Sequence, residues 1–145
     1  MREAPEYESF LWALNLRHFR PSELTSYARR ERRGVKNDLP PGALWPNIVK
    51  PLWILDLLRE HVASPITLVS SYRSPEYNGA ILGAAKASQH TRNRALDFRV
   101  KGKSASEVAK ILKDWRSAGV FKGGIGTYQS QNFVHIDTRG TNATW

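Results

Sequence analysis

The sequence contains no cysteine, and this absence removes several kinds of site at once. A chain without cysteine has no disulfide, no thiolate ligand for a metal and no thiol nucleophile. The absence does not decide the cellular compartment. Any metal site in this chain has to be built from histidine and carboxylate side chains.

Long apolar runs are also missing. No apolar run in the 145 residues approaches the roughly 18 that a membrane-spanning helix needs. Residues 1–6 carry acids and a proline where a signal peptide needs an apolar stretch. We therefore expect no membrane insertion, and a protein that stays in the cytoplasm unless something else releases it. The length fits a single domain, residues 1–145, with a real core.

Acidic residues are scarce: 13 Asp and Glu stand against 22 Lys and Arg, for a net charge of +9. Such a charge predicts attraction to polyanions, either nucleic acid or an anionic bacterial wall polymer. The densest basic run, residues 29–33, can equally be a solvated helix end whose cations complement the helix dipole. No recognition-helix, zinc-finger or RNA-binding pattern accompanies the charge, so we expect no specific nucleic-acid partner.

Three side chains form a candidate metal site: His90, Asp97 and His135. Two imidazoles and a carboxylate are typical of a catalytic zinc site, which keeps one position open for water. The alternative, that each is an ordinary solvated or hydrogen-bonded polar group, applies better to the two other histidines. His18 lies in a predicted turn, and His61 ends a predicted helix, where a cation is favourable.

Strand periodicity predicts that two of these side chains converge. Apolar residues alternate with Asp97 over residues 94–100, and with His135 over residues 133–137. If both strands share a sheet whose apolar face is buried, Asp97 and His135 emerge together on the other face. His90 belongs to the loop that leads into the first of these strands.

The sequence predicts four helices and four strands. We expect helices from Pro21 towards Arg33 (Ser22 as N-cap, Gly34 at the exit), over 47–62, over 75–85 (Ser74 as N-cap), and from a capping box at residues 104–107 to about 119. Strands are expected at 66–72, 94–100, 122–128 and 132–138, with a loop at 38–46. The glycines at 123, 124 and 126 are followed by a strand rather than a helix, so they indicate close backbone approach rather than a phosphate site. Trp145 is a candidate to cover the cleft.

A family resemblance rests on several motifs in order: residues 71–78 (SYRSPEYN), 88–90 (SQH), 94–97 (RALD) and 123–138. They resemble the zinc D-alanyl-D-alanine peptidases of bacteria and phages, and the last segment is similar to their murein endopeptidase and phage lysin branch. The resemblance covers about residues 65–140. It implies an α+β, hedgehog-like fold: a small central antiparallel sheet with helices packed on one face. It also implies one Zn²⁺ ion on His90, Asp97 and His135, with Arg73 and Ser88 facing the substrate.

The chain departs from this family pattern at two places. Asn93 stands where many members have glycine, a mild change because asparagine tolerates positive φ. Asn132 and Phe133 occupy the two positions where relatives carry the general base. Asp137, on the same strand face as His135, either activates the water or orients a metal ligand, and we slightly favour the second role.

The sequence therefore predicts a zinc-dependent peptidase that hydrolyses peptidoglycan, with Asp137 and Arg73 as catalytic candidates and Arg73 and Ser88 as substrate-binding candidates. Arg73 has a plainer alternative, a surface ion pair with Glu76. The expected partners are peptidoglycan stem peptides and the anionic wall polymer, and we expect a monomer in a phage-type or virion-associated setting. The alternatives are a catalytically idle zinc-binding interaction module on the same fold, and a basic nucleic-acid-binding protein with an incidental metal site.

Overall fold

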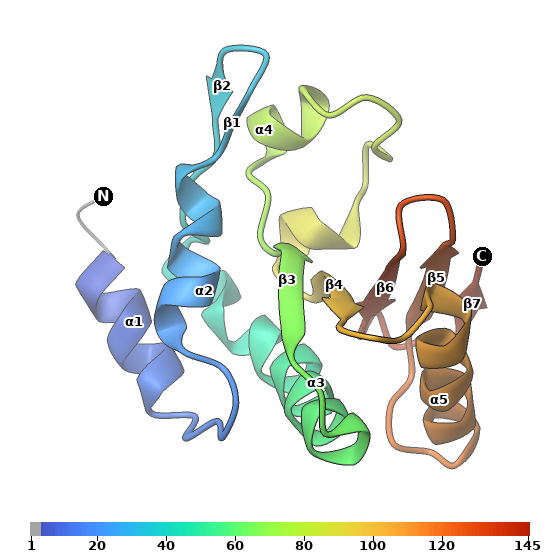
Figure 1. Ribbon diagram of the computed structural model, residues 1–145. Helices are drawn as coiled ribbons and strands as arrows, with labels where there is room; N and C mark the ends of the chain where they lie inside the picture. The colour runs from blue at the N-terminus through green and yellow to red at the C-terminus, as the bar shows by residue number, and fades with distance from the viewer. Residues whose placement is uncertain (1–3) are drawn as a thin grey trace.

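The computed structural model describes residues 4–145, so part of the N-terminal segment considered for a signal peptide lies outside the described residues. A five-stranded sheet in the order β3-β4-β6-β5-β7 forms the centre of the molecule (Figure 1). Its strands are β3 (Ile66–Ser70), β4 (Ala95–Val100), β5 (Gly124–Tyr128), β6 (Phe133–Asp137) and β7 (Ala143–Thr144). All pairs are antiparallel except β5 with β7, which is parallel. The predicted α+β class and the predicted 122–138 hairpin are confirmed.

One face of the sheet packs on helices α3 (Val49–Val62) and α5 (Ala105–Ser117). The apolar alternation predicted from the sequence places Leu96, Phe98, Val134 and Ile136 on this side, each at most 1 % exposed. Full burial of such a side chain contributes about 1.5–3 kcal/mol. Helix α5 begins as predicted, because Ser104 and Glu107 form its capping box.

The other helices are short. They are α1 (Ala4–Trp12), α2 (Pro21–Thr25) and α4 (Pro75–Gly79), with 3-10 turns η1 (Tyr27–Arg29), η2 (Gly42–Ile48) and η3 (Gln89–Arg92). In Figure 1, α4 and the loop after it lie above β3 and β4, on the side away from α3 and α5. No helix among residues 4–145 combines the length and the apolar character that membrane crossing requires.

The helix predicted from Pro21 towards Arg33 is wrong beyond Thr25. Its N-cap is Arg20 rather than Ser22, and the basic run enters a hairpin of β1 (Glu31–Arg32) and β2 (Val35–Lys36). Arg33 and Gly34 form the two-residue turn, both with positive φ (53° and 80°), as a type I′ hairpin requires. Gly34 therefore closes a hairpin rather than a helix.

The helix predicted over 75–85 is too long. Ser74 caps it as expected by accepting a hydrogen bond from the Tyr77 amide, but it ends at Gly79. The Asn78 side chain donates to the Ala85 carbonyl at 2.9 Å and bends the following segment back on itself. Glycine lowers helix propensity by about 1 kcal/mol, which favours the stop at Gly79.

Candidate metal centre

Four side-chain positions form a row across the polar face of the sheet. Ser70 on β3 lies opposite Asp97, Asp97 lies opposite His135, and His135 lies opposite Gly126. A β-bulge between Leu68 and Ser70 shifts the register so that Ser70 faces Asp97. Bulges commonly re-aim side chains next to functional sites. The predicted convergence of Asp97 and His135 is thus direct cross-strand pairing.

His90 reaches this row from η3, just before β4. The Ser88 side chain caps η3 by accepting a hydrogen bond from the His90 amide at 3.2 Å. Asn93 ends η3 with φ 57° and ψ 35°, which bears out the expectation that asparagine replaces glycine here at positive φ. The buried Asn93 side chain also donates to the Leu44 carbonyl at 3.0 Å and fixes the turn against the protein.

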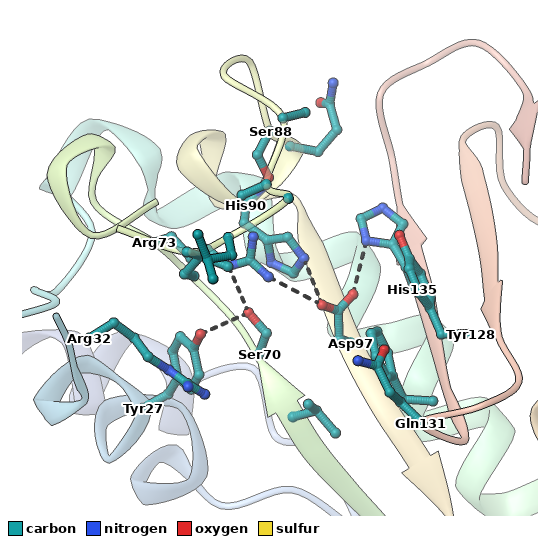
Figure 2. A pocket seen from close by; sticks show the side chains of 18 of the residues that line it. Tyr27, Arg32, Ser70, Arg73, Ser88, His90, Asp97, Tyr128, Gln131 and His135 are labelled. Carbon is teal, nitrogen blue, oxygen red and sulfur yellow. Dashed lines mark hydrogen bonds and ion pairs between the residues drawn. The ribbon is translucent and has the colours of Figure 1, made fainter. Parts of the chain in front are cut away.

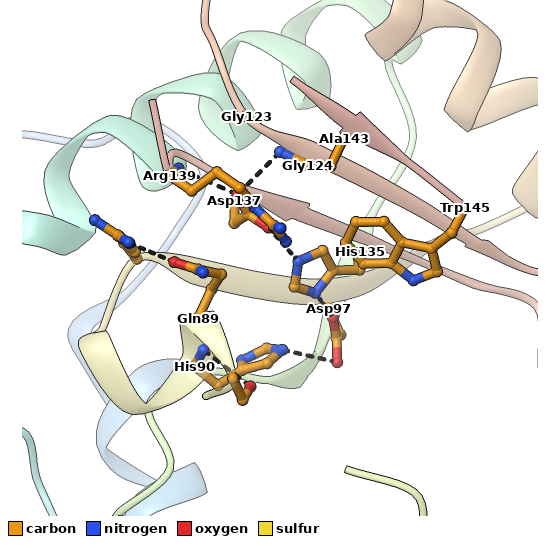
Figure 3. Close-up of polar contacts among 12 residues, drawn as sticks. Gln89, His90, Asp97, Gly123, Gly124, His135, Asp137, Arg139, Ala143 and Trp145 are labelled. Carbon is orange, nitrogen blue, oxygen red and sulfur yellow. Dashed lines mark hydrogen bonds and ion pairs between the residues drawn. The ribbon is translucent and has the colours of Figure 1, made fainter. Parts of the chain in front are cut away.

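His90, Asp97 and His135 come together as a compact, buried group (Figure 3). One ligand atom from each lies within 4.8 Å of the others. His90 Nε2 is 3.1 Å from Asp97 Oδ2, and His135 Nδ1 is 2.9 Å from Asp97 Oδ1. Two ligands about 2.0–2.1 Å from a tetrahedral ion lie roughly 3.4 Å apart, so the spacing suits zinc.

Each imidazole is oriented through its second nitrogen. His90 Nδ1 lies 2.8 Å from the Ser71 carbonyl oxygen, and His135 Nε2 lies 2.7 Å from Asp137 Oδ2. Carbonyl and carboxylate partners of this kind fix the tautomer of a metal-ligating histidine. The nitrogens left for an ion are His90 Nε2 and His135 Nδ1. His90 Nε2 is buried without a hydrogen bond of acceptable geometry, as expected of an atom whose partner is a metal.

The electrostatics favour an ionised carboxylate at the centre of the group. Burial lowers the pKa of His90 and thereby favours the neutral, ligating form. Burial works to raise the pKa of Asp97, but the adjacent imidazoles of His90 and His135 outweigh it and lower that pKa overall. Burial also acts to lower the pKa of His135, but hydrogen bonds to Asp137 and Asp97 outweigh burial and raise that pKa overall. Asp97 is therefore an ionised carboxylate between two imidazoles.

The family model described as Peptidase M15 matches residues 17–137. The chain belongs to the peptidase M15 family. The peptidoglycan L,D-endopeptidase MepK of Escherichia coli K12 is 40% identical over 78 residues, which cover 51% of this chain and 40% of the relative. The probable peptidoglycan L,D-endopeptidase MepK of Haemophilus influenzae is 34% identical over 84 residues, or 55% of this chain and 42% of the relative. The chain thus spans about two fifths of the length of these relatives, and no solved structure matches it significantly.

Enzymes of the M15 family are zinc-dependent peptidases, and the group of His90, Asp97 and His135 offers the donors that such an ion requires. The resemblance first seen in the short motifs is therefore confirmed over most of the chain. The ligand roles of the individual residues stay a prediction that the geometry supports.

Asp137 is fully buried, and both of its oxygens are occupied. Oδ1 accepts hydrogen bonds from the Gly124 amide, the Arg139 amide and Arg139 Nε, while Oδ2 contacts Arg139 Nη2 and His135. Although burial opposes it, hydrogen bonds from His135, Arg139 and Gly124 lower the pKa of Asp137. These contacts favour the orienting role over water activation. Arg139 was missed in the sequence, where its only signal is the i, i+2 spacing from Asp137.

Arg73 points into the centre rather than to the surface. Its Nε donates to Ser70 Oγ at 3.1 Å, and its Nη2 is 3.5 Å from Asp97 Oδ2. Among the ion pairs of the described residues, none joins Arg73 to Glu76, so the plainer alternative is wrong. The predicted substrate-facing position of Arg73 agrees with its place on the wall of the cleft.

The two positions expected to carry a general base supply none in this M15 chain. The Asn132 side chain accepts a hydrogen bond from the Ala105 amide at the start of α5, and Phe133 stacks on Tyr128 with ring centroids 4.4 Å apart. Within the described part of the chain, Asp97 is the only carboxylate that lines the cleft.

The cleft has a volume of about 600 Å³ and includes Ser88 on its wall. Trp145 lines the cleft beside His135 and Tyr128. Its ring centroid lies 5.0 Å from that of His135, and its Nε1 donates to Tyr128 Oη at 2.8 Å. A Cβ atom on Gly126 would lie 2.6 Å from Trp145 Nε1. The glycine therefore permits close approach, as predicted, and Trp145 covers the edge of the cleft.

Proposed function

We propose that this chain is a zinc-dependent peptidase that hydrolyses peptide bonds in bacterial peptidoglycan. The observation that carries the proposal is the convergence of His90, Asp97 and His135 at the floor of a cleft, with unbonded His90 Nε2 directed into the group. The two MepK relatives, named as peptidoglycan endopeptidases, support the substrate.

His90 Nε2, an Asp97 oxygen and His135 Nδ1 would hold the ion. A bound zinc ion acidifies a coordinated water and polarises the scissile carbonyl. Ser71 and Asp137 keep the two imidazoles in their ligating tautomers.

Arg73 and Ser88 would position the substrate. The guanidinium of Arg73 stays charged, and its planar donors match a carboxylate or a developing oxyanion. Its contacts to Ser70 and Asn78 fix its orientation before the substrate arrives. The Ser88 hydroxyl, on the wall of the cleft, would supply a hydrogen bond to the stem peptide. The phage-type setting expected from the sequence stays part of this proposal.

The decisive experiment compares three proteins, each incubated with zinc, on purified sacculi: the native chain, His135→Ala and His61→Ala. We expect the native chain and His61→Ala to release peptides and to bind one equivalent of zinc, while His135→Ala does neither. His61 is the matched control because it lies on α3, outside the cleft. Mass analysis of the released fragments identifies the bond that is cut.

A second candidate function is an idle zinc-binding module, favoured by the absence of a base at Asn132 and Phe133. Stoichiometric zinc in the native chain without any released peptide would select this function. A native chain that binds no zinc would contradict both.

A further inference from the structure

The cleft carries more positive charge than its metal-binding group requires. Five arginines line it, against a single carboxylate, that of Asp97. Arg73 and Arg139 have acidic partners, Asp97 and Asp137 respectively. The other three arginines that line the cleft have no carboxylate partner within the described residues: 30, 32 and 99.

Arg30 and Arg32 come from the same edge of the cleft, the start of the β1–β2 hairpin. Both line the cleft, whereas Glu31 between them does not, as the alternation of an extended chain dictates. Glu31 is instead the cross-strand neighbour of Lys36. The Arg30 guanidinium lies over the Tyr27 ring, 5.0 Å from its centroid, and this contact restricts its position.

This edge connects directly with the metal centre. Tyr27 Oη accepts a hydrogen bond from Ser70 Oγ at 3.0 Å, and Ser70 is the cross-strand neighbour of Asp97. Figure 2 shows Arg32 and Tyr27 on one side of the cleft and Tyr128 on the other, with the metal-binding group between them. Arg30, Tyr27, Ser70 and Asp97 thus form a continuous series of neighbours along the cleft, which Arg32 also lines. A peptide bound over the metal centre would follow this series, at about 3.3–3.6 Å for each extended residue.

We propose that Arg30 and Arg32 form a subsite for a carboxylate that the substrate carries a few residues from the scissile bond. Two charged, unpaired guanidinium groups at the open edge of a cleft suit a carboxylate, which accepts bidentate hydrogen bonds from arginine. The inference rests on the proposed peptidase function, and it adds that the enzyme selects acidic over amidated peptides.

The test uses two synthetic stem peptides that differ at one group: L-Ala-γ-D-Glu-L-Lys-D-Ala-D-Ala with a free glutamyl α-carboxylate, two residues from its last peptide bond, and its twin with that carboxylate amidated. Calorimetry measures the affinity of the full chain for each, and mass spectrometry follows their hydrolysis in parallel. The variants are Arg30→Gln with Arg32→Gln, and Arg33→Gln as the matched control. Arg33 carries the same charge in the same hairpin but does not line the cleft.

We expect the native chain and Arg33→Gln to bind the free acid about tenfold more tightly than the amide, since hydrogen bonds to charged groups are the stronger kind. The double variant should bind both peptides alike. Three results would overturn the subsite: the native chain binds both peptides equally, the double variant keeps the preference for the free acid, or the native chain binds neither peptide. Tighter competition by inorganic phosphate than by the acidic peptide would also overturn it.

The two proposals fail differently. Hydrolysis without a preference for the carboxylate removes the subsite and leaves the peptidase. Carboxylate-dependent binding without hydrolysis of these peptides or of sacculi supports the subsite and removes the peptidase.

Discussion

At the scale of single residues, the centre depends on one buried carboxylate outside the metal-binding group. Asp137 hydrogen-bonds both His135 and Arg139, so the Arg139 guanidinium holds the carboxylate that orients a predicted metal ligand. The Asp137 side chain is fully buried, so its negative charge needs a partner. Arg139 supplies the positive charge, and its side chain is 26% exposed.

Asp137→Asn should weaken zinc binding about 10–100-fold, because an amide no longer orients His135 as a carboxylate does. It should also lower the free energy of unfolding by about 3 kcal/mol, the lower end for a broken buried pair, since Arg139 keeps some solvent. Zinc titration and thermal unfolding measure the two effects. Asp114→Asn, the same change at a side chain that is 68% exposed, should leave both unchanged. An Asp137→Asn protein with native zinc affinity would contradict the orienting role.

The sequence was sufficient to place Asp97 and His135 on one sheet face, because strand alternation decides it. It was not sufficient for Arg139 or Ser71, because their contacts depend on the turn after β6 and on a backbone carbonyl brought close by the fold. Every residue has a backbone carbonyl, so the identity of the Ser71 side chain does not indicate that its carbonyl orients His90.

At the scale of elements, the join between β5 and the C-terminal segment controls the edge of the cleft. The Trp145 amide donates to the Ile125 carbonyl, and Trp145 packs over Gly126. The indole is therefore held over the strand that pairs with the His135 strand.

Gly126→Ala should displace Trp145 from His135 and lower peptide hydrolysis, at a small cost in stability, because a half-exposed side chain can move away from the new methyl group. The shift of the Trp145 indole N–H signal in NMR spectra measures the displacement. Gly42→Ala is the control, since nothing lies within 4 Å of its added Cβ atom. An unmoved Trp145 signal in Gly126→Ala would contradict the close packing.

Helix α5 supports β5 and β6 from behind the centre. Ser104→Ala should lower the free energy of unfolding by about 1 kcal/mol, because the Glu107 amide loses its cap. Ser117→Ala at the exposed end of the same helix should have little effect. Chemical denaturation of both variants decides whether the cap contributes as expected.

Element prediction succeeded where a cap or a period was strong and failed where a turn competed with a helix. The capping box at Ser104 and the N-cap at Ser74 were both identified correctly. Glycine suits both a helix C-cap and a hairpin turn, so Gly34 alone does not separate the two, whereas the pairing of Arg32 with Val35 does.

At the scale of the whole molecule, the basic residues behind the net charge of +9 are partly gathered in one place. Some of them line the cleft, where composition alone had suggested a general attraction to polyanions. The sequence could not show this, because arginines from the start of the β1–β2 hairpin, the segment after β3, β4 and the segment after β6 meet only in the folded chain.

Zinc should stabilise the whole chain, because the metal-binding group exists only in the folded state. At a hundredfold excess over the dissociation constant, binding adds about 2.7 kcal/mol to the free energy of unfolding. The thermal midpoint should rise by several degrees with zinc and fall on chelation. His90→Ala should show no response to either treatment, and a zinc-independent midpoint in the native chain would contradict the metal site.

The transverse row from Ser70 through Asp97 and His135 to Gly126 draws one position from each of four strands. Until β4 and β6 pair, Asp97 and His135 stay apart and the row cannot hold the ion. Affinity for the ion therefore arises with that pairing, and metal uptake during refolding would time the moment when the sheet reaches its final alignment.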